Sequence, residues 1–199
     1  RGKSGRMIFT ARKNLKLDVS DRQIQILIGC LLGDAYLTKL GKIQIEQSDK
    51  QKDYISWKYQ ELASISYGFP KEVVRFDKKD NRVTKSFRFW TRQYFRSLRN
   101  KFYQGKQKIF PKDLSNLVTP LTIAVWYMDD GCYSKGQCIL STESFDDLSK
   151  EALIKKLKFF GIDGNLKSSG KLRIRSHSLP KFFELVRPYI HSSMYYKLP

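Results

Sequence analysis

The stretches LIGCLLGDAYL (residues 27–37) and LTIAVWYMDDGCY (residues 121–133) decide the fold of this 199-residue chain. Each is an apolar run that ends in an acid, Asp34 in the first and Asp130 in the second. A helix C-terminus carries partial negative charge, so a carboxylate there is unfavourable unless a cation binds beside it. Two such helices packed together would also bring two carboxylates close enough to repel each other. The pair therefore predicts a site for a hard divalent cation. Mg²⁺ fits, because it uses few carboxylates and completes its shell with water and phosphate oxygens.

The charge of the chain indicates a polyanionic partner. It has 38 Lys and Arg residues against 19 Asp and Glu, a net charge of +19 that is spread along the sequence. Nucleic acid is the first candidate partner. Metal ions activate water and stabilise charge on phosphorus, so an acidic pair in a basic protein favours phosphodiester hydrolysis. Two alternatives stay open: a basic surface that serves solubility, and binding to an acidic membrane surface, although no strongly basic amphipathic helix stands out.

The remaining composition narrows the class of protein. With 41% hydrophobic residues the chain is globular, and it has no apolar run of the roughly 18 residues that predict a membrane span. The N-terminal residues lack the apolar core of a secretory signal, although a removed targeting peptide stays open. We expect an intracellular protein, in an organelle (mitochondrion or chloroplast) or in prokaryotic cytoplasm. The cysteines and histidines have no zinc-finger spacing; they are Cys30, Cys132, Cys138, His177 and His191.

The pattern of helices, strands and turns occurs twice along the chain. After a basic arm over residues 1–19, residues 20–104 form a first half, residues 105–118 a linker and residues 119–199 a second half. Each half reads as helix, two strands, helix, two strands and helix. The repeat predicts an α+β fold in which two αββαββα units form a pseudo-twofold monomer with two antiparallel sheets.

Particular residues set the element boundaries. A helix is expected over residues 21–34, and another begins with Thr119 as N-cap and Pro120 as first residue. Gly68 and Pro70 are expected to end the first helical unit before the next strand pair. The hairpins that follow the two acids show equal spacing, which predicts these matched positions: Ser48 with Ser144, and Ile43 with Ile139.

Alternation along the strands predicts a polar face on each sheet. In KIQIEQS, Ile43 and Ile45 point one way and the polar residues the other. Arg, Lys, Gln and Ser are residues that read base edges or hold phosphates, so we expect this face to bind double-stranded DNA. The alternative is an ordinary solvated sheet face. The predicted DNA-binding residues are Lys42, Gln44, Glu46, Ser48, Arg75, Thr84, Ser86, Arg88, Gln137, Thr142, Lys167, Lys171, Arg173 and Arg175.

The sequences LIGCLLGDA and IAVWYMDDG resemble the two motifs of single-chain LAGLIDADG homing endonucleases. The second motif and the ending MYYKLP are most similar to the mitochondrial-intron type, with its WFMDDG-like second motif. The resemblance implies that the motif helices pack at a central pseudo-twofold axis and that the sheets form a saddle over the DNA major groove. It also implies a sequence-specific double-strand endonuclease that leaves short 3′ overhangs within a long asymmetric target.

The resemblance also implies roles for residues near the motifs. Asp34 and Asp130 would be the catalytic, Mg²⁺-binding pair, with the residues that follow them, Ala35 and Gly131, at the metal site. The family places a basic residue late in the sheet of each half; Lys171 is the candidate in the second half, and Arg92 or Lys85 in the first. Gln47 and Glu143 are candidates for ordering water. Asp129 is expected to accept a hydrogen bond or to support the site from behind.

Two departures from the family pattern bear on packing. Ala35 replaces the last Gly of the first motif. Val125 and Asp129 stand where the first motif has Gly29 and Gly33. We therefore expect asymmetric packing, in which bulk from the second helix enters the space left by the two glycines.

Other functions remain open from the sequence. A protein of this fold could act as a maturase that binds its own intron RNA. It could also bind DNA without cutting, although such a protein should have lost one of the acids. A nuclease of the His-metal finger class fits poorly, because neither His177 nor His191 lies in a ββα setting.

Overall fold

The computed structural model describes residues 15–199, without the side chains of residues 112 and 114. Most of the predicted basic arm, residues 1–14, therefore lies outside the described part. Among the described residues, no helix is both long and apolar enough to cross a membrane.

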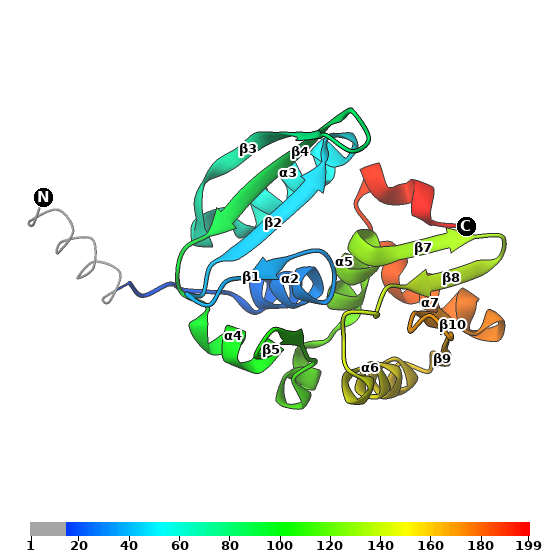
Figure 1. Cartoon of the computed structure of the whole chain (residues 1–199). Helices are drawn as coiled ribbons and strands as arrows, with labels where there is room; N and C mark the ends of the chain where they lie inside the picture. Colours follow the sequence, from blue (N-terminus) through cyan, green and yellow to red (C-terminus); the bar gives the residue numbers. More distant parts are fainter. Residues whose placement is uncertain (1–14) are drawn as a thin grey trace, which may run out of the picture.

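The first half follows the predicted order of elements (Figure 1). Its helices and strands are α2 (Asp21–Leu32), β1 (Tyr36–Leu37), β2 (Ile43–Ser48), α3 (Lys52–Leu62), β3 (Ser66–Asp77), β4 (Arg82–Thr91) and α4 (Arg96–Phe102). A short hairpin, β5 (Tyr103–Gln104) and β6 (Gln107–Lys108), then leads into the predicted linker.

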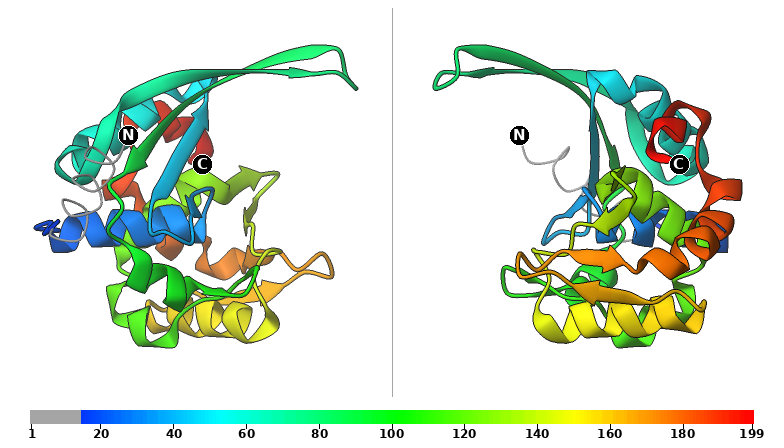
Figure 2. Two further views of the ribbon diagram at one scale, coloured as in Figure 1. Left: turned by 60° about the vertical axis from the view of Figure 1, so that its left-hand side comes forward. Right: turned by 90° about the vertical axis from the view of Figure 1, so that its right-hand side faces the viewer.

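The second half repeats this order. Its elements are α5 (Pro120–Asp130), β7 (Gly131–Ser134), β8 (Gln137–Leu140), α6 (Asp147–Phe159), β9 (Gly164–Leu166), β10 (Leu172–Ile174) and α7 (Leu179–Val186). The first sheet has the strand order β1-β2-β4-β3 and the second β7-β8-β10-β9, and all neighbouring strands pair antiparallel. The predicted duplication is therefore confirmed in the topology. Figure 2 shows the two sheets on either side of the central helices.

Helix ends follow the local rules that the sequence indicated. Ser20 caps α2 through a capping box with Gln23. Thr119 caps α5, with Pro120 as its first residue, as predicted.

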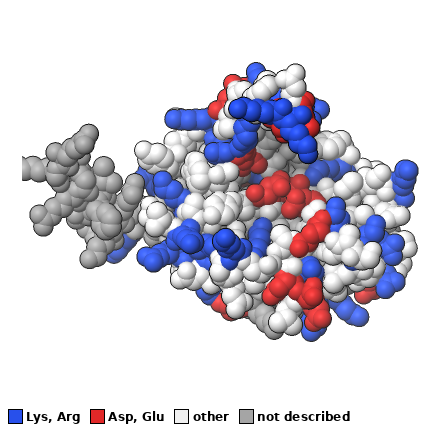
Figure 3. Space-filling view, in the orientation of Figure 1, with Lys and Arg blue, Asp and Glu red and all other residues white. Residues whose placement is uncertain are grey.

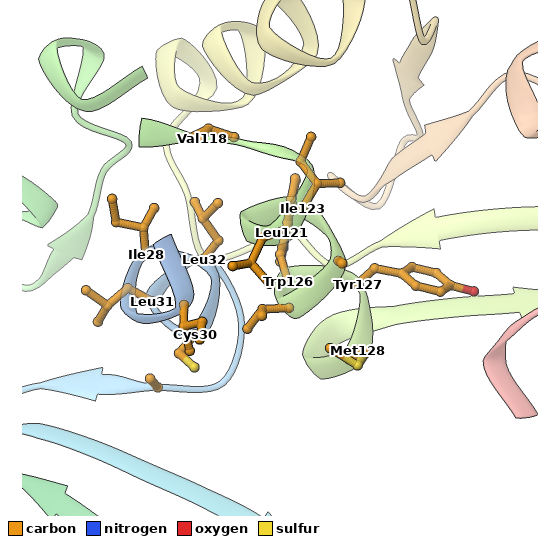
Figure 4. Close-up of a cluster of buried hydrophobic side chains, with 14 of the residues drawn as sticks. Ile28, Cys30, Leu31, Leu32, Val118, Leu121, Ile123, Trp126, Tyr127 and Met128 are labelled. Atoms are coloured by element: carbon orange, nitrogen blue, oxygen red, sulfur yellow. The ribbon is translucent and has the colours of Figure 1, made fainter. Parts of the chain in front are cut away.

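The motif helices α2 and α5 pack against each other at the centre of the molecule. Figure 4 shows their apolar side chains, including Leu31, Leu32 and Trp126, gathered in one buried cluster. A Cβ added to Gly29 would lie 2.7 Å from Val125 Cβ, and one added to Gly33 would lie 2.5 Å from Asp129 Cβ. The expected asymmetric packing is confirmed, because Val125 and Asp129 occupy the space that the two glycines leave.

Two predicted boundaries in the first half are wrong. α2 ends at Leu32 with Gly33 as C-cap, so Asp34 lies beyond the helix rather than at its last turn. Strand β3 begins at Ser66 and continues through Gly68 and Pro70 instead of starting after them. Gly68 has a φ of +71°, and the register shifts between Tyr67 and Lys71, so the strand absorbs these residues in a bulge.

The matched positions in the two hairpins are offset by one residue. Leu37 pairs with Ile43 in the first hairpin, whereas Tyr133, at the same distance from its acid, pairs with Cys138. Ile43 therefore corresponds to Cys138 and not to the predicted Ile139. The reason is the second hairpin's tight turn, in which Lys135 and Gly136 have positive φ.

Candidate active site

Asp34 and Asp130 meet where the two motif helices end. Burial, and then the negative charge of Asp34 and a hydrogen bond with it, raise the pKa of Asp130 to about 7. The predicted pairing of one carboxyl group from each half is thus present. Asp34 is exposed and Asp130 is half-buried, so the pair lies open to a ligand on one side.

Gln47 reaches the pair from the first sheet. It lies on β2 and is buried, and its amide Nε2 donates to Asp34 Oδ2 at 3.4 Å. It is the one predicted site residue of the first sheet that contacts an acid of the pair among the described residues.

Two lysines that the sequence reasoning missed contact the ends of the motif helices. Lys108, on β6, donates from Nζ to the carbonyl oxygen of Gly33 at 3.0 Å. Lys197 donates from Nζ to the carbonyls of Met128 and Asp129, at 2.6 and 3.3 Å. Each amine therefore reaches the residue just before one acid, and the two lysines occupy equivalent places in the two halves.

Burial of these amines changes their acidity. Desolvation lowers the pKa of Lys108 to about 8, against the opposing charges of Asp130 and Asp34. Desolvation also lowers the pKa of Lys197, and the same acidic charges oppose it. A signal was present in the sequence: Lys108 and Lys197 each stand shortly before a proline near the end of a half, in KIFP and KLP.

Among the described residues, no ion pair or hydrogen bond joins the predicted basic residues to Asp34 or Asp130. Lys171 forms an ion pair with Glu143 at 3.2 Å, and Lys85 lies 3.9 Å from Glu72. Arg92 has an exposed side chain beyond the end of β4. Lys171 and Arg92 stay predictions, and we add Lys108 and Lys197 as candidate basic groups because both donate to main-chain carbonyls at the motif ends.

The side chain of Asp129 is buried beside the acidic pair, where it bonds to residues of α3. Its Oδ1 accepts from Tyr54 Oη at 2.8 Å and from Lys58 Nζ at 2.5 Å, and the side chains of Asp129 and Lys58 are fully buried. Desolvation raises the pKa of Asp129, and the charge of Lys58 opposes that rise. The expectation that Asp129 accepts a hydrogen bond is confirmed. Lys58 and Tyr54 were missed, since on the sequence they read as ordinary residues of an exposed helix.

The oxygens at the seam fit a hard divalent cation. Burial and then the negative charge of Asp34 raise the pKa of Asp130, and a cation beside the two carboxyl groups would relieve their repulsion. Ala35 and Gly131 could take part only through main-chain carbonyls. Within residues 15–199 no group of three or more His, Cys, Asp or Glu side chains could hold a metal, so water and phosphate oxygens would complete the shell.

Comparison with known proteins identifies the family. The sequence matches the LAGLIDADG DNA endonuclease family over residues 24–182. The chain belongs to this family. The homing endonuclease I-WcaI bound to its DNA recognition sequence is similar in structure, with a TM-score of 0.83 and 26% identity over 100% of this chain and 95% of that chain. The N-terminal LAGLIDADG domain of WhiA shares the fold, with a TM-score of 0.52 and 12% identity.

Curated relatives of this LAGLIDADG protein come from yeasts and bacteria. The cytochrome b mRNA maturase bI2 of Debaryomyces hansenii is 26% identical over 93% of this chain and 76% of its own length. The RecA protein of Mycolicibacterium fallax is 27% identical over 98% of this chain and 50% of its own length. The maturase bI2 of Saccharomyces cerevisiae is 29% identical over 88% of this chain and 47% of its own length. The chain thus spans about half the length of the last two relatives.

An ordered cluster of charged residues covers the first sheet of this LAGLIDADG protein. Glu46 accepts from Arg75 Nη1 at 2.5 Å, from Ser86 Oγ at 2.5 Å and from Arg88 Nε at 2.7 Å. Desolvation acts to raise the pKa of Glu46, but these hydrogen bonds and the charge of Arg88 lower it to about 2. Four of the predicted DNA-binding residues are therefore brought together on one face, and Gln44 donates to the same carboxylate at 3.1 Å.

The other predicted DNA-binding residues vary in exposure. Ser48, Gln137, Lys167 and Arg175 are exposed, while Lys42, Thr84, Lys171 and Arg173 are half-buried. Thr142 is fully buried and donates to the carbonyl of Gly170 at 2.6 Å, so the expectation that it faces DNA is wrong. The shorter turn of the second hairpin is the reason, because it moves Thr142 to the buried position that Gln47 has in the first half.

The charge distribution on this face agrees with a polyanionic ligand. Figure 3 shows acidic side chains in the middle of the face, with Lys and Arg above and on both sides.

Proposed function

We propose that this chain is a sequence-specific endonuclease that cuts both strands of a long, asymmetric DNA target by Mg²⁺-dependent phosphodiester hydrolysis. The observation that carries the proposal is the meeting of Asp34 and Asp130, one from each half, with a pKa of about 7 for Asp130. A like-charge pair in a strongly basic protein fits a site where a metal joins the protein to phosphate.

The side chains around Asp34 and Asp130 have different roles in the proposed reaction. Asp34 and Asp130 hold the metal, which when bound supplies an activated water and stabilises charge on phosphorus. The Gln47 amide orients Asp34. Lys108 and Lys197 lie beside the acids, where they offset negative charge that develops on the phosphate. The pseudo-twofold relation gives each DNA strand one motif end, and one chain suffices as a monomer.

Exchange of the acids tests the proposal. A duplex that the protein selects from a random library is incubated with the protein and Mg²⁺. We expect a defined double-strand cut by the wild type, and a loss of at least about a thousandfold in cleavage rate for Asp34→Asn or Asp130→Asn, with DNA affinity nearly unchanged. Asp147→Asn, an exposed acid on α6, serves as the control and should cut normally. Full cutting by either variant of the pair would reject the site.

A second candidate function is assistance to RNA splicing. It is favoured by the similarity to the cytochrome b mRNA maturases bI2 of two yeasts. The test is a splicing assay with the RNA that surrounds this gene. Stimulation that persists in Asp34→Asn would establish a role independent of cutting, whereas no stimulation would restrict the protein to DNA. Since the relatives come from both yeasts and bacteria, both predicted locations, an organelle and prokaryotic cytoplasm, remain proposals.

A further inference from the structure

The two sheets of the molecule differ greatly in size. Strands β3 and β4 have 12 and 10 residues, whereas their counterparts β9 and β10 have 3 each. At about 3.3 Å per residue, β3 is roughly 40 Å long and β9 roughly 10 Å. Figure 2 shows that the hairpin of β3 and β4 projects well beyond the body of the molecule.

Packing in the body does not account for the length of this hairpin. Its outer part exposes apolar side chains on the face away from the Arg cluster: Val74, Phe76 and Val83 are 56, 57 and 55% exposed. A strand pair that continues past its core gains little stability from its own burial. The projecting part therefore requires a reason outside the body.

The opposite face of the hairpin carries two arginines, Arg75 and Arg88, that Glu46 holds in place. Glu46 fixes Arg75 through Nη1 and Arg88 through Nε. Among the described residues, no hydrogen bond uses the two terminal Nη groups of Arg88. An arginine held in this way can offer a pair of N–H groups to the O6 and N7 of guanine.

We propose that the protein reads its two half-sites to unequal depth. The hairpin of β3 and β4 extends specific contacts to the outer base pairs of the half-site under the first sheet. The short strands β9 and β10 limit contact to base pairs nearer the cut. With about 3.4 Å per base pair, the strands could span about 12 base pairs on one side and about 3 on the other. Glu46 is a positioning residue that holds Arg75 and Arg88 for this reading. This inference rests on the proposed DNA-binding function.

The test measures base preference at every position of the target. The full chain with Asp34→Asn, which should bind without cutting, is selected against a random duplex library. A shortened variant replaces residues 76–83 by Asn-Gly, which joins the cross-strand partners Arg75 and Thr84 through a two-residue turn. Arg88→Ala identifies the half-site that lies under the first sheet. Lys155→Ala on α6 is the control, since the replacement also removes one net positive charge.

We expect the parent protein to specify bases farther from the centre on one side than on the other. The shortened variant should lose its preference by at least about tenfold at the outermost of these positions only. Arg88→Ala should weaken the preference for one base pair on that same side by about tenfold to a hundredfold. Lys155→Ala should leave the base preferences unchanged. The shortened variant could fail to fold. The inference is then tested by the base-preference profile of the parent protein and by Arg75→Ala, which should weaken base preference in the deeper half-site.

Two results would overturn the inference. The first is a parent protein that specifies bases equally far from the centre on both sides. The second is a shortened variant whose base preferences equal those of the parent protein. Either leaves the proposed endonuclease in place. A parent protein without any sequence preference would instead contradict the proposed function itself, and this inference with it.

Discussion

The two halves of the molecule are alike at the centre and unlike at the edges. At the seam each motif ends in an acid, Asp34 or Asp130, and beside each a lysine, Lys108 or Lys197, reaches the carbonyl just before that acid. At the periphery the hairpin of one sheet is several times longer than that of the other. The difference indicates that the two halves share the arrangement of groups at the seam and diverge in the surface that each sheet presents.

The two halves also differ from each other at the centre of the molecule. The glycines of α2 face the larger side chains of α5, and Asp129 of the second motif depends on Lys58, which belongs to the first half. The second motif is therefore stabilised by the opposite half. The following changes test how unequal the two halves are.

The largest expected effect is on stability, through Lys58→Met. The substitution leaves Asp129 buried without its counter-ion, and we expect the free energy of unfolding to fall by about 3–5 kcal/mol. Denaturant unfolding followed by circular dichroism measures the loss. The double variant Lys58→Met with Asp129→Asn should recover most of it. A single variant as stable as the wild type would show that the pair does not stabilise the seam.

Removal of the two site lysines comes next. We expect Lys108→Met and Lys197→Met each to slow cleavage by about a hundredfold to a thousandfold, because each removes a positive charge beside the acids. Single-turnover cleavage of each strand measures the effect, with Lys106→Met, an exposed neighbour on the same hairpin, as control. Equal losses of cleavage rate would show that the two lysines contribute equally to catalysis. Unequal losses would show that their equivalent positions do not give equal contributions. Unchanged rates in both would contradict the assignment.

A smaller effect is expected from overfilling the helix contact. Gly29→Ala places a Cβ 2.7 Å from both Val125 Cβ and the carbonyl oxygen of Thr122, which should cost about 1–3 kcal/mol of stability. The reciprocal variant Val125→Gly removes one of these two contacts. The combination should therefore be more stable than the sum of the single effects predicts. Simple additivity in thermal or denaturant unfolding would show that the two positions do not share the space.

The smallest expected effect is on the pH dependence of stability. Burial and the charge of Asp34 raise the pKa of Asp130 from 3.8 to about 7 in the fold. The folded protein therefore keeps this proton at pH values where the unfolded chain has lost it. The stability contributed by Asp130 is present below about pH 4 and is lost as the pH rises toward 7.

Thermal unfolding across this pH window, without metal, measures the contribution. The difference in stability between wild type and Asp130→Asn should shift against the wild type as the pH rises. Mg²⁺ should restore wild-type stability above pH 7 and should have little effect on Asp130→Asn. A difference that does not change with pH would show that the two carboxyl groups do not interact.

The sequence predicts what depends on local pattern. The motif helices, the caps at Thr119 and Pro120 and the order of helices and strands along the chain follow from apolar periodicity and turn residues, and the family follows from the resemblance of the two motifs that end in an acid. The pairing of Asp34 with Asp130 follows from that resemblance, which implies that the two motif helices pack at one axis.

The missed features depend on contacts between distant segments. Lys58 meets an acid 71 residues away, and nothing in its own helix distinguishes it from a solvated lysine. Lys108 and Lys197 reach the motif ends from segments that read as a linker and a tail. Thr142 was misplaced because a hairpin that is one residue shorter exchanges the faces of the strand that follows, and sequence spacing alone does not show this.

The position of Lys108 has a consequence for any attempt to divide or recombine the molecule. This lysine lies in the segment that joins the halves, yet it donates to Gly33 of the first half. In a chimera that joins residues 1–104 of this chain to the second half of another protein, that other protein would supply the residue at position 108. Asp34 would then have a neighbour that did not come from its own sequence. A split version of the protein should therefore keep residues up to Pro111 with the N-terminal fragment, so that each piece carries its own acid and its own amine.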